Sequence, residues 1–231
     1  MKTLGLIGGI SWESTAHYYT RINQLVAHRL GGLHSAQLLL YSVEFDEIQR
    51  LQHADDWAGC ARIFTGIARR LEQAGAQGLI ICANTMHLVA PEVAAAVSIP
   101  VLHVADATAA AMQEAGVATA ALLGTRFTME KPFYRDHLEQ HGLRVLVPEE
   151  ADRIELHRII FQELCRGVVR EESKDAFYDV VNRLVQAGAG GAILGCTEFS
   201  LLMDAARSRV PLFDTTELHA RAAVDWMLGQ E

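Results

Sequence analysis

Residues 71–85 read LEQAGAQGLIICANT, and residues 184–198 read LVQAGAGGAILGCTE, an ungapped match 113 positions later. In both stretches a helical pattern leads through glycine into a uniformly apolar run, as in a strand covered on both faces. Two more echoes follow at similar offsets: TLGLIGG (3–9) resembles TAALLGT (119–125), and 100–102 resembles 211–213. Three echoes in the same order indicate a duplicated α/β unit.

The rest of the chain has the same alternation of short apolar runs and helical patterns. The runs are residues 4–7, 37–43, 78–83, 101–104, 118–123, 143–147, 191–194 and 210–213. Such alternation predicts parallel sheets with helical crossovers. The predicted fold class is therefore α/β, with two similar domains related by a pseudo-twofold duplication. We expect residues 1–98 plus 211–231 to form the first domain and residues 99–210 the second.

Composition restricts the partners. The chain is 50% hydrophobic and 21% charged, as globular proteins are, and its formal charge of −8 argues against nucleic acid. No apolar stretch reaches about 18 residues, so we expect no membrane span. The first apolar run meets Trp12 and Glu13 without a cleavage motif, so we expect no signal peptide and a cytoplasmic protein. The four cysteines form no CxxC pair, which favours neither a zinc site nor a disulfide framework.

The duplication predicts where a ligand binds. Ligands of open α/β sheets bind beyond the carboxyl ends of the strands. If the two halves face each other there, the active site lies at the domain interface. The segments at these strand ends are Gly8–Trp12, Cys82–Thr85, Gly124–Thr128 and Gly195–Glu198.

Cys196 follows a strand, and Thr197 or Glu198 begins the next helix. Free N–H groups at a helix start stabilise negative charge, so this position is expected to lower the pKa of the thiol. A thiolate here would serve as a base or nucleophile. The alternative is a small core cysteine.

The equivalent position in the first half holds no thiol. The repeat aligns Ala83 with Cys196, and Cys82 with Gly195. Successive strand residues point to opposite faces, so if position 83 faces the cleft, Cys82 faces away from it. Cys82 is then a core cysteine.

Polar residues surround these strand-end segments, which we call corners. Asn84 and Thr85 either cap a helix or bind a ligand carboxylate or amine. Ser11 and Thr125 follow the two glycine turns at the ends of the first strand of each half. His87 fits a packing or surface position better than an acid/base role.

Taken together, these motifs resemble the aspartate/glutamate racemase family of cofactor-independent amino-acid racemases, in its broad-specificity branch. The resemblance covers the whole chain through GLIGGISWEST (5–15), FDEIQRLQ (45–52), CANTMH (82–87), LLGTRFTM (122–129), IIFQELCRG (159–167), GCTE (195–198) and LFDTTELHA (212–220). It implies two α/β domains, an interdomain site and a homodimer. It also implies an amino acid as the small-molecule substrate, with no cofactor, no pyridoxal phosphate and no metal.

The family mechanism uses two thiols on opposite faces of Cα. Cys196 fits the second thiol, whereas the first position is Ala83, with Cys82 one residue too early. Either a register shift brings Cys82 into the cleft, or water or another side chain serves, or the chemistry is one-sided.

The resemblance also suggests substrate-binding residues. We expect Asn84, Thr85, Thr125 and Thr197 to bind the α-carboxylate and ammonium, with Ser11 nearby and Glu198 tuning the thiol or binding the ammonium. Arg50 is a candidate for a side-chain carboxylate, unless it is a solvated helix charge, and Gln52 belongs to the same motif.

By the same resemblance, Glu163 is expected to stand where family members acting on acidic substrates have lysine. A glutamate there would repel a second carboxylate and favour a neutral or amino-bearing side chain. The predicted function is a cofactor-independent amino-acid racemase for aspartate/glutamate or a broader substrate. The alternatives are a one-thiol decarboxylase or isomerase on the same scaffold, and a catalytically impaired amino-acid-binding protein.

Overall fold

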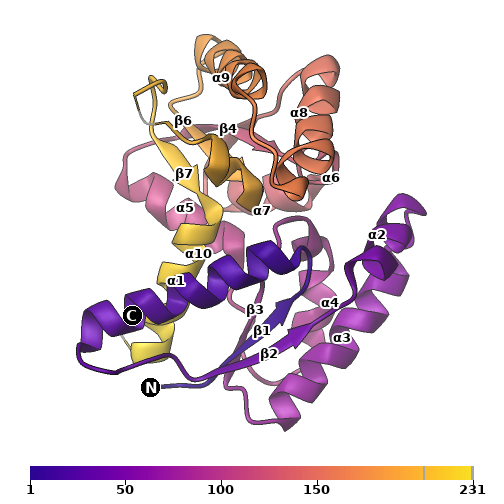
Figure 1. The fold of residues 1–231 in the computed structure, drawn as a ribbon, viewed down its shortest axis with the longest axis vertical. Coiled ribbons are helices and arrows are strands. Elements are labelled where there is room, and N and C mark those ends of the chain that lie inside the picture. Colours follow the sequence, from indigo (N-terminus) through magenta and orange to yellow (C-terminus); the bar gives the residue numbers. More distant parts are fainter. Residues whose placement is uncertain (205, 230–231) are drawn as a thin grey trace. The chain divides into compact units, whose positions relative to one another are not determined.

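The computed structural model describes residues 1–204 and 206–229. The chain divides into two compact units: unit 1 comprises Met1–Val104 and Thr216–Glu231, and unit 2 comprises Ala105–Thr215. The bar in Figure 1 relates colour to residue number, so the two chain segments of unit 1 can be followed in indigo to magenta and in yellow.

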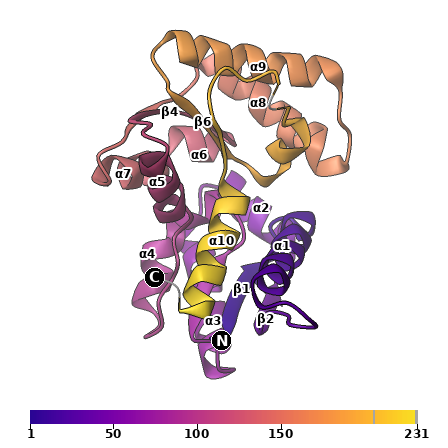
Figure 2. The same cartoon turned by 90° about the vertical axis from the view of Figure 1, so that its left-hand side faces the viewer.

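Unit 1 is built on a three-stranded parallel sheet with strand order β2-β1-β3. The strands are β1 (Leu4–Gly8), β2 (Leu38–Ser42) and β3 (Gly78–Ile81). The helices are α1 (Trp12–Leu30), α2 (Phe45–His53), α3 (Trp57–Gln73), the 3₁₀ helix η1 (Thr85–Val89), α4 (Ala90–Ala95) and α10 (Thr215–Leu228). Alternate strand residues enter two cores. Ile7 and Ile81 pack with Phe64 of α3, whereas Leu6 and Ile80 pack with α1 and α10. Figure 2 shows α10 beside α1.

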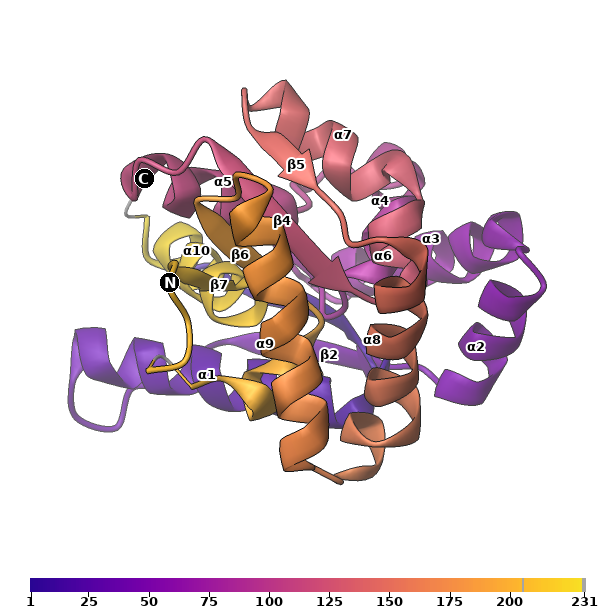
Figure 3. The same ribbon diagram turned by 90° about the horizontal axis from the view of Figure 1, so that it is seen from above.

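Unit 2 is built on a four-stranded parallel sheet with strand order β5-β4-β6-β7. The strands are β4 (Thr119–Gly124), β5 (Arg144–Leu146), β6 (Gly191–Gly195) and β7 (Leu212–Asp214). The helices are α5 (Val104–Glu114), α6 (Arg126–Glu130), α7 (Pro132–Gln140), α8 (Glu150–Gln162), η2 (Leu164–Arg166), α9 (Glu171–Gln186) and η3 (Thr197–Leu202). Figure 3 shows α8 and α9 side by side, and both pack on Leu123 and Leu194 of the sheet. The predicted α/β class with parallel sheets is confirmed.

The internal repeat is visible in the sheets. In unit 1 Leu79 forms a parallel bridge with Val101, and in unit 2 the equivalent Ala192 pairs with Leu212. The predicted strand at 101–104 is reduced to this bridge, whereas β7 pairs over three residues, although α5 and α10 begin at the equivalent positions Val104 and Thr215. Both sheets therefore have the same strand arrangement. The edge strand that would correspond to β7 is reduced to a single bridge in unit 1.

The limits of the units differ from the expected domain limits. The sequence grouped residues 211–231 with the first domain, whereas β7 pairs with β6 inside unit 2. The chain passes from unit 1 to unit 2 after Val104, and back after Thr215. Each passage coincides with the start of a helix, α5 in one case and α10 in the other.

Candidate active-site corners

The turn after β1 is shaped by two glycines. A Cβ on Gly8 would lie 2.4 Å from Cγ2 of Thr15, and Gly9 has φ +92° with its Cβ position 2.4 Å from the carbonyl oxygen of Val43. The N–H of Gly9 donates to Oγ1 of Thr15 at 2.8 Å, and that hydroxyl donates to the carbonyl of Ser11 at 2.9 Å. A side chain at either glycine would displace this turn.

Ser11 and Thr125 occupy equivalent helix caps in the two units. Oγ of Ser11 accepts the N–H of Ser14 at 3.3 Å, and Oγ1 of Thr125 accepts the N–H of Thr128 at 3.2 Å. Each cap hydroxyl also lies within hydrogen-bond distance of the hydroxyl three residues on. Capping is thus a demonstrated role of both residues. Ser14 and Thr128 were not singled out from the sequence, although the repeated S/T-x-x-S/T spacing at one offset could have revealed them.

The corner after β3 separates Cys82 from Ala83. Cys82 is fully buried among the side chains of α1 and α10, whereas Ala83 packs in the core on the α3 side of the sheet. Burial alone raises the pKa of the Cys82 thiol far above its usual value. The two neighbours point to opposite faces, as strand alternation requires.

Asn84 and Thr85 lie at the start of η1, and both are buried. The carbonyl of Asn84 accepts the N–H of His87 at 3.0 Å, and its side chain does not cap this helix.

His87 of η1 is a buried packing residue. Its Nδ1 donates to the carbonyl of Ala83 at 2.9 Å, and its Nε2 accepts the N–H of Val104 at 3.2 Å. Burial first, then the nearby imidazoles of His103 and His219, lower the pKa of His87 well below its usual value. His87 is therefore neutral and ties η1 to the segment that leads out of unit 1.

The corner after β6 carries the candidate thiol. A Cβ on Gly195 would lie 2.7 Å from the carbonyl oxygen of Leu123, so the strand end admits only glycine there. Cys196 follows as the N-cap of η3 and is buried. Its Sγ donates to Oε2 of Glu198 at 2.9 Å, and the hydroxyl of Thr197 donates to the same oxygen at 2.7 Å. A thiol, a hydroxyl and a carboxylate thus meet at this strand end.

The sequence-based expectation of a lowered thiol pKa is wrong. Burial, followed by the negative charge of Glu198 and the neighbouring Cys165, raises the pKa of Cys196 well above its usual value. The N–H of Glu198 acts in the opposite direction. The helix that follows is only a six-residue 3₁₀ segment, so its N-terminus stabilises a thiolate weakly. Burial and the Glu198 carboxylate destabilise the thiolate more strongly than this helix start stabilises it.

Arg50 and Gln52 of α2 differ in burial. The Arg50 side chain is 76% exposed and forms an ion pair with Asp46 one turn earlier. Gln52 is buried, and its Nε2 lies 3.0 Å from Sδ of Met86. Because Met86 directly follows Thr85, Gln52 contacts the strand-end segment after β3. Arg50, by contrast, is a solvated charge on the helix surface.

Glu163 is buried at the end of α8. Its carboxylate accepts hydrogen bonds from the hydroxyl of Ser173 at 2.5 Å and from the guanidinium of Arg158 at 2.7 Å. The hydrogen bond from Ser173, supported by Arg158, holds the pKa of Glu163 below its usual value against the effect of burial. The negative charge expected to repel a substrate is therefore balanced within unit 2.

Comparison with known proteins adds to this geometry. Over residues 7–223 the sequence matches the family described as Asp/Glu/Hydantoin racemase. A solved Yersinia pestis structure, described as a candidate Asp/Glu racemase, is 50% identical over 99% of this chain and 100% of that chain, with a TM-score of 0.93. An aspartate racemase homologue from Pyrococcus horikoshii is 35% identical over 99% and 100% of the two chains, with a TM-score of 0.87.

A curated relative is more distant. The broad specificity amino-acid racemase RacX of Bacillus subtilis is 22% identical over 71% of this chain and 70% of that protein. Among residues 1–204 and 206–229, no helix has both the length and the apolar character that a bilayer crossing requires. The family and the structural neighbours support a racemase-type isomerase. The chain belongs to the Asp/Glu/Hydantoin racemase family.

Proposed function

We propose that this protein is a cofactor-independent amino-acid racemase in which Cys196 exchanges a proton with Cα of the substrate. The observation that carries the proposal is the 2.9 Å contact between Sγ of Cys196 and Oε2 of Glu198 at the carboxyl end of β6. It supplies a thiol and a proton acceptor at a strand end, where open α/β sheets bind ligands.

The proposed abstraction of the Cα proton balances within this pair. The S–H proton passes to the Glu198 carboxylate, which leaves a thiolate and a neutral carboxylic acid. The thiolate then takes the Cα proton, and the electron pair of the C–H bond remains on Cα. The environment that raises the pKa of Cys196 makes the thiolate scarce but also a stronger base. Return of a proton to the carbanion from a donor on the opposite face inverts the configuration. Glu198 then releases its proton to solvent, and the donor takes one back from solvent.

The returning proton must come from a group other than residue 83, because Ala83 has no exchangeable proton. Cys82 is buried on the other side of the sheet, so water or another side chain is the proposed donor. Ser11, Asn84, Thr85, Thr125 and Thr197 are the proposed ligands of the α-carboxylate and ammonium. Their hydroxyl and amide dipoles would stabilise charge that develops as the carbanion forms.

We propose a broad or neutral amino-acid substrate rather than a strictly acidic one. Arg50, the expected partner of a side-chain carboxylate, is exposed and paired with Asp46. Glu163 gives no further support for this preference, because Arg158 and Ser173 balance its charge. The broad-specificity name of the Bacillus relative agrees with the proposal.

The decisive test is hydrogen–deuterium exchange at Cα in D₂O, with a panel of L- and D-amino acids and chiral analysis of the same samples. Exchange with inversion from both enantiomers is expected. Cys196→Ala should abolish it, and the matched variant Cys82→Ala should largely preserve it. Equal loss in two folded variants would contradict the assignment of Cys196 as the reacting thiol.

The vacant position at Ala83 favours a second candidate, a one-thiol decarboxylase or isomerase. Exchange with retention from one enantiomer would identify a one-sided isomerase. Carbon dioxide release from a disubstituted malonate, without racemisation, would identify a decarboxylase. Amino-acid binding that is unchanged in Cys196→Ala, with no turnover in either protein, would indicate a binding protein.

We further propose that the protein is a homodimer. Unit 1 has a surface hollow lined by Trp12, Thr15, Ala16, Tyr19, Thr20, Leu40 and Ser42. Three of these apolar side chains are exposed, Trp12 by 69%. A second copy of the chain is the proposed occupant, since large exposed apolar groups at one place are typical of interfaces. Light scattering should give the dimer mass for the wild type and the monomer mass for Trp12→Ser with Tyr19→Ser.

A further inference from the structure

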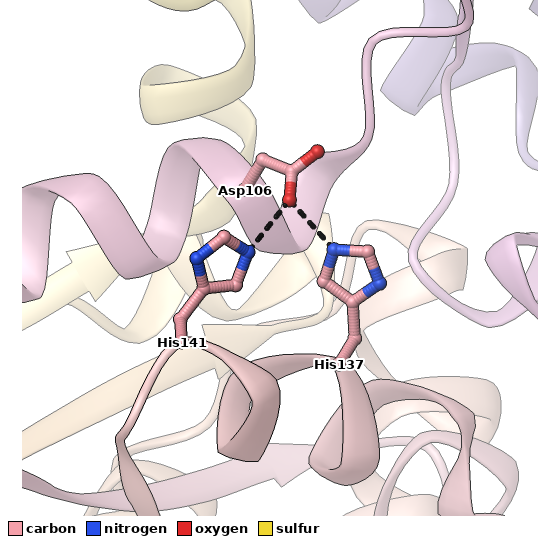
Figure 4. A group of neighbouring side chains, drawn as sticks. All are labelled: Asp106, His137 and His141. Atoms are coloured by element: carbon pink, nitrogen blue, oxygen red, sulfur yellow. Dashed lines mark hydrogen bonds and ion pairs between the residues drawn. The ribbon is translucent and has the colours of Figure 1, made fainter.

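Unit 2 carries a cluster of two histidines and one aspartate that the proposed racemisation does not use. Asp106 lies in the first turn of α5, His137 in the last turn of α7, and His141 directly after α7. Nε2 of His137 is 2.6 Å and Nε2 of His141 is 2.9 Å from Oδ1 of Asp106. Figure 4 shows both imidazole rings directed at this one carboxylate oxygen.

The backbone holds these side chains close together. His137 and His141 are four residues apart, so their side chains lie on one face of the helix, with ring centroids 5.5 Å apart. Two further contacts join α5 to α7 and its end. The hydroxyls of Thr108 and Tyr134 lie 3.2 Å apart in the interior, and Nε2 of Gln113 donates to the carbonyl of His141 at 3.0 Å. The three side chains therefore project from a braced pair of helices.

The three ligand atoms suit a transition metal. They all lie within 4.8 Å of one another. Zinc binds imidazole nitrogen and carboxylate oxygen at about 2.0–2.2 Å, so tetrahedral ligands are about 3.3 Å apart. The Nε2–Oδ1 distances of 2.6 and 2.9 Å need to widen by less than about 1 Å, which rotation of exposed side chains allows.

Solvent reaches the cluster. The side chains of His137, His141 and Asp106 are 28%, 38% and 53% exposed. A cation can therefore enter and complete its coordination with water. In the metal-free protein both Nε2–H groups donate to the carboxylate, so binding moves each ring proton from Nε2 to Nδ1 through solvent and frees Nε2 for the metal.

We propose that Asp106, His137 and His141 form a binding site for a divalent transition-metal cation of the zinc class. Two imidazoles and one carboxylate are the ligand types that zinc takes in open sites, where water fills the fourth position. The proposal does not depend on the racemase reaction, because none of these residues belongs to the proposed machinery. A bound ion would join the start of α5 to the end of α7 and stabilise unit 2.

The test is titration of the chelator-treated full chain with Zn²⁺, followed by calorimetry, and with Co²⁺, followed by its visible absorption. One equivalent of Zn²⁺ is expected to bind with a Kd of about 10 µM or below. His137→Gln and His141→Gln keep an N–H donor for Asp106 but remove the imidazole ligand. Each should weaken binding at least about tenfold, and the double variant should show neither binding nor the cobalt spectrum.

The matched control is His28→Gln with His34→Gln, which also removes two exposed histidines but outside the cluster. It should bind Zn²⁺ as the wild type does. Circular dichroism of each variant checks folding, and Zn²⁺ should raise the Tm of the wild type and the control but not of the His137→Gln, His141→Gln protein. Absence of binding to the wild type at 100 µM Zn²⁺, or undiminished binding to that double variant, would overturn the proposal.

Discussion

Cys196 and Glu198 form a proton-sharing pair at the end of β6, with Sγ and Oε2 2.9 Å apart. The carboxylate opposes the thiolate through its charge and, at the same time, is the nearest group able to accept the thiol proton. A single negative charge can thus reside on either member of the pair.

Glu198→Gln should lower the pKa of Cys196, because it removes the negative charge that opposes the thiolate while burial remains. Peptide-resolved alkylation of Cys196 across pH 7–10 measures this shift. The rate profile should move to lower pH, while Cα exchange falls because the proton acceptor is lost. Thr197→Val is the control, since it removes a hydroxyl on the same oxygen without changing charge. An unmoved alkylation profile in Glu198→Gln would show that Glu198 does not set the pKa.

His87 should make the protein less stable in mild acid. Its folded-state pKa lies well below the usual histidine value of 6.5, so below that pH the unfolded chain binds a proton that the folded chain does not. The contribution of His87 to the free energy of unfolding is therefore fully present above about pH 6.5. Below that pH it falls by about 1.4 kcal/mol per pH unit. Urea unfolding between pH 5 and 7 measures the slope. In His87→Gln the slope of the free energy of unfolding against pH should decrease by the amount that corresponds to one proton. In the exposed-site control His34→Gln this slope should not change.

Glu163→Gln should destabilise unit 2 by about 1–3 kcal/mol, because a buried charged acceptor loses its charge beside Arg158. Glu155→Gln is the matched control. Glu155 also pairs with Arg158 at 2.7 Å, but its side chain is 45% exposed, so the expected loss is below about 1 kcal/mol. Because the pKa of Glu163 is lowered, its contribution is present above about pH 4.5 and should disappear as the pH falls through the folded-state value. Equal losses in the two variants would contradict the role assigned to burial.

The two equivalent helix caps predict matched losses of stability. Ser11→Ala and Thr125→Ala should each lower the free energy of unfolding by about 1 kcal/mol, since each removes the acceptor for a helix N–H. Ser11→Asp and Thr125→Asp keep a capping oxygen and should restore most of the loss. Chemical denaturation of the wild type, the alanine variants and the aspartate variants measures these free energies of unfolding. A loss that aspartate does not recover in either protein would mean that these hydroxyls contribute through something other than capping.

Part of the fold could be predicted from the sequence because it is encoded locally. The duplicated helix–strand motif predicted two parallel sheets, and residue alternation predicted opposite faces for Cys82 and Ala83. The edge positions were harder to predict. The apolar run at 101–104 and the run at 210–213 look alike, yet one gives a single bridge and the other a paired strand. The start of the following helix does not explain the difference, because α5 and α10 begin at the equivalent positions Val104 and Thr215. Short apolar runs do not specify how far an edge strand pairs.

By itself the sequence determined the α/β class, the repeat and the positions of the polar corners, because periodicity and glycine turns are properties of neighbouring residues. Only the tertiary structure decided the direction in which the pKa of Cys196 is shifted. It placed Cys196 in a buried site facing Glu198, which raises the pKa that a helix start alone would lower. It also brought Asp106 to His137 and His141 from 31 and 35 positions away. Burial and long-range contact set pKa values and ligand sets, and neither can be read from local spacing.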